Sequence, residues 1–92
     1  MKYLKVSADT EVGGLAGAIA GSLRRGEDAE VVSVGAGALN QAVKAVVIAK
    51  EFLAKEGKDI AMEPRFSEVC IDNKEKTAIN LHIFEILLEE AA

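Results

Sequence analysis

The sequence has few side chains with specialised chemistry. Its 92 residues include one cysteine, Cys70, and one histidine, His82. A single cysteine excludes an intramolecular disulfide, and no cluster of cysteine and histidine has the spacing of a metal site. Glu68 and Asp72 are the near neighbours of Cys70, and they supply none of the positive charge that activates a thiol. We therefore expect Cys70 to be a small core residue, and we predict no bound metal.

Catalytic and nucleotide-binding motifs are also missing. No serine or cysteine has a recognisable nucleophile setting, the carboxylates have no paired spacing, and His82 is expected to be a packed or partly exposed residue of a strand. Gly35 and Gly37 begin neither a phosphate-binding loop of the Gly-Lys-Ser/Thr type nor a dinucleotide fingerprint, because Asn40 stands where the latter needs glycine. The sequence predicts a protein that is not an enzyme and has no cofactor.

Long apolar runs are absent as well. Lys44, Lys50, His82 and Glu85 interrupt the longest ones, so none approaches the ~20 residues that span a bilayer. The residues after Met1 are too charged for the centre of a signal peptide. We therefore expect a cytoplasmic protein with no membrane partner, folded as one domain over residues 1–92 with a modest core that self-association would help.

The charge balance disfavours one large class of function. Fifteen acidic residues against 11 basic ones give a net charge of −4. Coating nucleic acid by bulk electrostatics requires concentrated lysine and arginine, which neutralise phosphate. The composition leaves only a local basic face open.

Hydrophobic periodicity predicts the secondary structure. Alternating residues predict a strand over 2–7. A β-branched run predicts a second strand over 29–34, buried on both faces and therefore central. Helical spacing predicts helices over 12–24, with Asp9 or Thr10 as N-cap, and over 38–56. An extended stretch over 59–71, in which Pro64 favours a bend or an edge position, should then pair through a polar turn at 72–75 with a strand over 76–87.

The predicted order is β-α-β-α-β-β, an α/β chain of the two-layer α+β type. Two helices on one face of a four-stranded mixed sheet are the natural packing. The other face of the sheet then needs polar residues or a partner subunit.

Three glycines four residues apart, Gly13, Gly17 and Gly21, lie in the first predicted helix. Each costs roughly 1 kcal/mol of helix stability relative to alanine, which suggests that they have a use. We expect the stripe to allow tight packing of the helix on the sheet. Arg24 and Arg25, at the end of this helix, would contact phosphate only if the fold placed them beside Gly35.

The most informative stretch is the turn from the central strand into the second helix. The first backbone N–H groups of a helix have no partner within it and carry its positive dipole end, so they suit an anion. The candidate residues for contacts with phosphate or sugar are those of the turn and of the first two turns of the helix: Gly35, Ala36, Gly37, Asn40, Gln41 and Lys44. Alternatively, Asn40 and Gln41 only cap the helix and Lys44 is solvated.

Four blocks of the sequence strongly resemble the stage V sporulation protein S family. They are residues 4–8, 17–21, 35–45 and 76–79, and the resemblance spans nearly the whole chain. That family looks related in fold to the Alba chromatin proteins and to the C-terminal domain of the third translation initiation factor. The resemblance therefore implies an Alba-like sandwich with the order predicted above.

The resemblance also implies a homodimeric nucleic-acid-binding or regulatory protein that affects spore development, dividing-wall formation or coat assembly. In Alba-like proteins the loops before both helices and the last hairpin face the nucleic acid. Here the first loop reads Asp9-Thr10-Glu11 and the hairpin tip Asp72-Asn73-Lys74-Glu75, which depart from a basic pattern. This departure argues against tight coating of double-stranded DNA and leaves weak, RNA-directed or regulatory binding open.

Three hypotheses follow for the function. The first is a dimeric Alba-like module that binds DNA or RNA through residues 35–44. The second is a protein-interaction or scaffold factor in sporulation or septation, which suits the negative charge and the acidic loops. The third is a domain that binds a small anion at the same turn.

Overall fold

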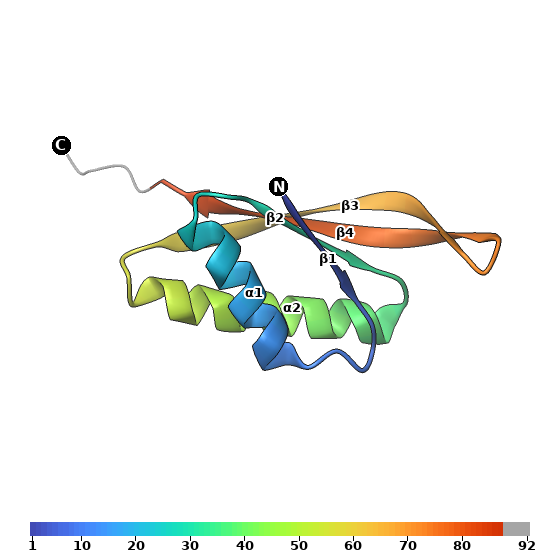
Figure 1. Ribbon diagram of the computed structural model, residues 1–92, viewed down its shortest axis with the longest axis horizontal. Helices are drawn as coiled ribbons and strands as arrows, with labels where there is room; N and C mark the ends of the chain where they lie inside the picture. The colour runs from blue at the N-terminus through green and yellow to red at the C-terminus, as the bar shows by residue number, and fades with distance from the viewer. Residues whose placement is uncertain (88–92) are drawn as a thin grey trace.

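The computed structural model describes residues 1–87 and contains a four-stranded sheet with two helices (Figure 1). The elements are β1 (Lys2–Val6), α1 (Val12–Arg24), β2 (Ala29–Ser33), α2 (Ala36–Ala54), β3 (Asp59–Ile71) and β4 (Lys74–Ile86). The strands are ordered β1-β2-β4-β3, with β1 parallel to β2 and the other pairs antiparallel. The predicted order, the mixed sheet and the two-layer architecture are confirmed.

Strand β2 lies in the interior of the sheet because its residues are buried on both faces, as the sequence predicts. Ala29 and Val31 belong to the core that the helices cover, and both are fully buried. Strand β3 lies at the edge, where the missing N–H group of Pro64 is tolerated. The expectation for Pro64 is therefore confirmed.

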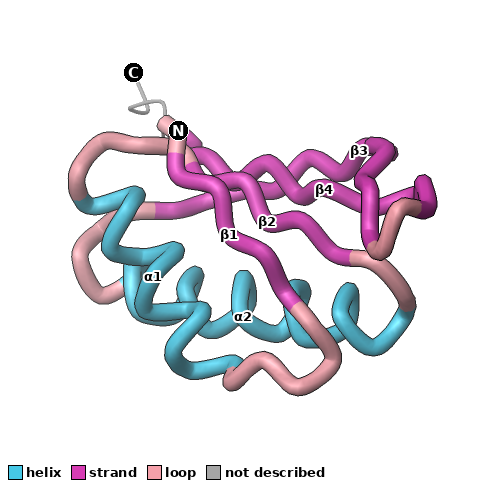
Figure 2. Tube along the Cα trace, turned by 45° about the vertical axis from the view of Figure 1, so that its right-hand side comes forward, coloured by secondary structure: helices cyan, strands magenta, loops and turns pink. Residues whose placement is uncertain are grey.

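Both helices pack on the same face of the sheet (Figures 1 and 2). Alanine side chains let the helices come close together: Ala16 and Ala20 of α1 are fully buried, and so are Ala42 and Ala45 of α2. The expectation of tight packing by the glycine stripe is wrong. Gly13 and Gly17 are exposed, and a Cβ atom added to Gly17 would meet no atom within 4 Å, because the glycines lie on the side of α1 turned away from the core.

The hairpin of β3 and β4 is much longer than the other strands. Each of its strands has 13 residues, whereas β1 and β2 have 5 each. Asp72 and Asn73, at φ values of 52° and 62°, form its two-residue turn, which matches the mirror-image turns that tight hairpins prefer. The turn is shorter than the predicted 72–75, because β4 already begins at Lys74.

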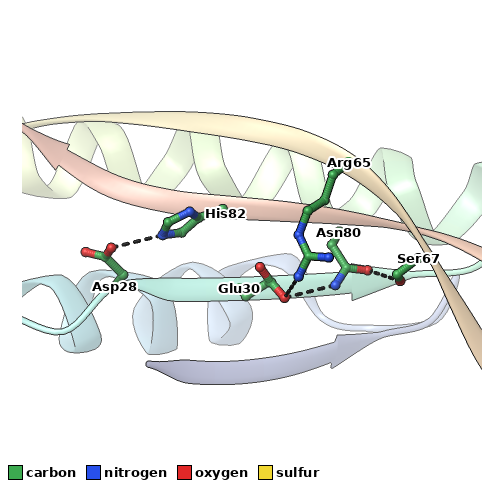
Figure 3. Close-up of polar contacts among 6 residues, drawn as sticks. All are labelled: Asp28, Glu30, Arg65, Ser67, Asn80 and His82. Carbon is green, nitrogen blue, oxygen red and sulfur yellow. Dashed lines mark hydrogen bonds and ion pairs between the residues drawn. The ribbon is translucent and has the colours of Figure 1, made fainter.

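A polar cluster lies on the open face of the sheet, by which we mean the face turned away from the helices (Figure 3). Nη2 of Arg65 donates to Oε2 of Glu30 at 2.6 Å, and Nδ2 of Asn80 donates to the same oxygen at 2.9 Å. Ser67 Oγ donates to Oδ1 of Asn80 at 2.6 Å. These bonds cross three strands, from β2 over β4 to β3, and hold the long hairpin to the centre of the sheet.

The side chain of Glu30 is only 4% exposed. Burial raises the pKa of its carboxyl group, but the hydrogen bonds from Arg65 and Asn80 and the positive charge of Arg65 outweigh burial, so the net pKa lies below its ordinary value. Nearby, Nε2 of His82 lies 2.9 Å from Oδ2 of Asp28. His82 is half-buried in β4, which confirms its expected place as a sheet residue.

Substitution of Asn80 by alanine should destabilise the protein by about 1–3 kcal/mol, because a buried carboxylate then loses a donor. Chemical denaturation measures this loss. The matched control is Ser67→Ala, which leaves both donors to Glu30 in place and should cost less, about 0.5–1.5 kcal/mol. Equal losses in the two variants would show that the carboxylate does not depend on Asn80.

The stability of the protein should depend on pH through Glu30. Since the pKa of the folded state lies below the ordinary value of 4.5, the contribution of the ionised carboxylate is fully present above pH 4.5 and is lost as the pH falls through the folded pKa. Glu30→Gln should therefore be less stable than the wild type at neutral pH, and this difference should shrink below pH 4.5. A difference in unfolding free energy that stays constant with pH would contradict the assignment.

Candidate nucleic-acid interface

The N-terminus of α2 is open to solvent. Gly35 is its N-cap, at φ 90° and ψ 158°, and no side chain caps the helix. A positive φ favours glycine, because a Cβ atom would be strained there. Ala36 and Gly37 are exposed, so the unpaired N–H groups of the first turn face water.

The N-terminus of α1 is different because the chain supplies its own anion. The carboxylate of Glu11 accepts hydrogen bonds from the N–H groups of Gly13 and Gly14. The prediction of Asp9 or Thr10 as N-cap is therefore wrong, since Glu11 is the N-cap and Thr10 instead accepts the N–H group of Ser7 at 2.8 Å. Of the two helices in the described part of the chain, α2 alone lacks a side-chain cap.

The β1–α1 loop packs directly against the start of α2. A Cβ atom added to Gly37 would lie 3.0 Å from Cβ of Ala8, so a larger residue there would have to push the loop away by a few tenths of an ångström. Nε2 of Gln41 donates to the carbonyl oxygen of Thr10 at 2.9 Å. Gln41 therefore fixes the loop and does not cap its own helix, a role that no sequence signal indicated.

Asn40 and Lys44 lie one helical turn apart on α2, as predicted, and both are exposed. Within residues 1–87, no ion pair includes Lys44. An amide group and an ammonium group therefore stand free near the open helix N-terminus. Together they offer hydrogen-bond donors and a positive charge to an anion.

Three regions meet at one end of the molecule: the β1–α1 loop, the turn into α2 and the side of the long hairpin that leads to its tip (Figure 2). The ends of β1 and β2 and the hairpin line a hollow of about 650 Å³ beside the α2 turn. Lys5 and Lys76 are its charged residues. The sequence analysis missed both lysines, because only the register of the sheet brings them to the same end as the glycine turn.

Arg24 lies far from the Gly35 turn. Arg24 pairs with Glu56 at 2.7 Å, beyond the C-terminal end of α2, which is roughly 28 Å from its start at 1.5 Å per residue. Arg24 is therefore not a phosphate ligand of the Gly35 turn.

The prediction that Cys70 is a core residue is wrong. Cys70 is exposed, because the hairpin extends beyond the layer of helices.

Neither α1 nor α2 combines the length and apolar character that a membrane-crossing helix requires. The comparison with protein families gives a match to the model described as "Stage V sporulation protein S (SpoVS)". It covers residues 2–86, and so includes every element of the fold and every residue of the candidate interface. The match supports a role related to sporulation, and the chain belongs to the stage V sporulation protein S family.

Proposed function

We propose that this protein is a non-enzymatic, cytoplasmic nucleic-acid-binding factor that contacts the phosphate backbone at the N-terminus of α2. The observation that carries the proposal is the uncapped, exposed first turn at Gly35, Ala36 and Gly37. Backbone N–H groups at a helix N-terminus bind phosphate through hydrogen bonds and the helix dipole. Family membership supports a role related to sporulation.

Each residue of the interface has a distinct part in this proposal. The amide groups of the first turn bind one phosphate, and Asn40 and Lys44 contact the sugar or the next phosphate along the exposed face of α2. Gln41 acts indirectly, because its bond to the carbonyl oxygen of Thr10 holds the β1–α1 loop in place. Contacts of this kind position a protein on the backbone without reading sequence.

The contrast between the two helices supports the same assignment. Glu11 would repel a phosphate at α1, where its carboxylate already occupies the N–H groups. A protein with a net charge of −4 depends on a small number of good phosphate contacts. Such a protein binds weakly and acts as a regulator more readily than as a coat on duplex DNA.

We also propose that the protein acts as a homodimer. Met62, Pro64 and Phe66 follow the buried Ile60 at every second position of β3, so they lie on the same face as Ile60, which is the helix side of the sheet. Phe66 is 76% exposed, and it lines a shallow hollow with Pro64 and Ile79. An exposed apolar patch of this kind suits a second copy of the chain.

Lys44→Ala should weaken binding to DNA and RNA of any sequence, because a phosphate contact carries no base information. The slope of log K against log salt should fall in magnitude by about 0.9 for duplex DNA or about 0.7 for single strands. Fluorescence anisotropy over a salt series measures both changes. Lys55→Ala, at the other end of α2, is the matched control and should bind like the wild type. Unchanged binding in Lys44→Ala, or no binding by the wild type at low salt, would overturn the assignment.

Phe66→Glu should convert the dimer to a monomer while the domain stays folded, because the Phe66 side chain is largely exposed in the single chain. Sedimentation equilibrium measures the mass in solution. Tyr3→Glu is the matched control, since Tyr3 is an aromatic residue 65% exposed on the open face. A wild type that is monomeric, or a dimer lost in Tyr3→Glu and kept in Phe66→Glu, would contradict this interface.

A further inference from the structure

The hollow beside the α2 turn has a mostly apolar lining. Its volume of about 650 Å³ lies within the ~300–1,000 Å³ of ordinary ligand sites. Its apolar walls come from both sides of the gap between the short strands and the hairpin. The main apolar residues of these walls are Val32, Val34, Val69 and Ile71, and the charged residues of the hollow are Lys5 and Lys76.

The charge of the hollow is opposite to that of the whole protein. Among residues 1–87, lysine supplies both charged side chains of the hollow and no carboxylate lines it, although the chain has 15 acidic residues and 11 basic ones. Neither Lys5 nor Lys76 takes part in an ion pair of residues 1–87. The hollow therefore favours an occupant that combines an apolar surface with negative charge.

The hollow lies beside the open helix N-terminus. Val34, which lines the hollow, immediately precedes the N-cap Gly35. Ala8, another lining residue, packs against the position of Gly37. Val34 of the hollow and Ala36 of the first helical turn are two residues apart, and two residues of extended chain span at most about 7 Å. One nucleotide can therefore reach from the first turn of α2 into the hollow.

The hairpin wall of the hollow is held in place before any ligand arrives. Arg65 and Ser67 precede Val69 on β3, and their hydrogen bonds to Glu30 and Asn80 attach this strand to the centre of the sheet. A preformed wall lowers the cost of ordering on binding. This part of the hairpin therefore needs no rearrangement to receive a ligand.

We propose that the hollow receives an unstacked base of a single-stranded nucleic acid whose phosphate lies at the N-terminus of α2. This proposal rests on the function proposed above and specifies its substrate as single-stranded. The apolar walls cover the faces of the base, and Lys5 and Lys76 attract the flanking phosphates. A duplex keeps its bases stacked inside and offers this hollow only its charged backbone, so it gains nothing from the apolar walls.

The test compares three labelled ligands in fluorescence anisotropy at low salt. They are oligothymidylate of roughly 12 nucleotides, within the ~4–16-nucleotide range of single-strand sites, an abasic deoxyribose-phosphate oligomer of the same length, and a duplex of that length. Oligothymidylate should bind roughly tenfold more tightly than the abasic oligomer, since one base packed against protein side chains raises the affinity by about this factor. The duplex should bind no more tightly than the abasic oligomer.

Two substitutions at one position separate the hollow from the phosphate site. Val69→Gln makes the wall polar without adding charge and should remove the preference for oligothymidylate over the abasic oligomer. Val69→Leu keeps the wall apolar and should retain the preference. Binding of the abasic oligomer should be the same in both variants, because it depends on α2.

A measurement on the wild-type protein does not depend on whether the variants fold. Cys70 is exposed and lines the hollow, so oligothymidylate should slow its alkylation by iodoacetamide, and the abasic oligomer should not. Equal affinity for both oligomers without protection of Cys70, or tighter binding of the duplex, would overturn the base site and leave the phosphate site standing. The absence of binding to all three ligands would overturn both. Protection of Cys70 by an acidic peptide and not by oligothymidylate would assign the hollow to a protein partner.

Discussion

The arrangement of the sheet depends on the hydrogen bonds and the ion pair of the buried Glu30 carboxylate. It is buried in the central strand β2, and its two donors come from the two strands of the hairpin. A buried charge is tolerated only when partners replace the water it has lost. If the hairpin slid along β2, the buried carboxylate would lose its donors, at a large cost in free energy. The register of β2 with β4, which joins residues about 50 positions apart in the chain, is thus fixed by electrostatics as well as by hydrophobic packing.

This fixed register explains how one end of the protein acquires a binding surface. Because β1 and β2 stop after 5 residues while the hairpin continues, the sheet leaves a hollow beside the start of α2. The β1–α1 loop closes another side through the contacts of Ala8 and Gln41. The hollow is therefore a consequence of the difference in strand length, and it lies beside a helix N-terminus that no side chain caps.

Sequence periodicity was sufficient for the layers, the order of the elements and the central place of β2, because these follow from which residues avoid water. It placed the start of β4 late, since residues 74–77 are exposed on both faces and carry no alternation. The position of the glycine turn was also predictable, because it depends on local backbone chemistry. The contacts of Gln41, the Glu30 cluster and the lysines of the hollow were not, because each depends on elements that only the tertiary fold brings together. The predictions for the environments of Cys70 and of the glycine stripe in α1 were wrong for the same reason.

The edge position of Pro64 has a consequence for the behaviour of the protein in concentrated solution. Strand β3 is a long edge, and an edge of 13 residues would ordinarily be a template on which other chains add as further strands. Pro64 lies near its middle and has no N–H group to donate, so no foreign strand can pair continuously along it. A single residue thereby protects the longer of the two edge strands from edge-to-edge aggregation.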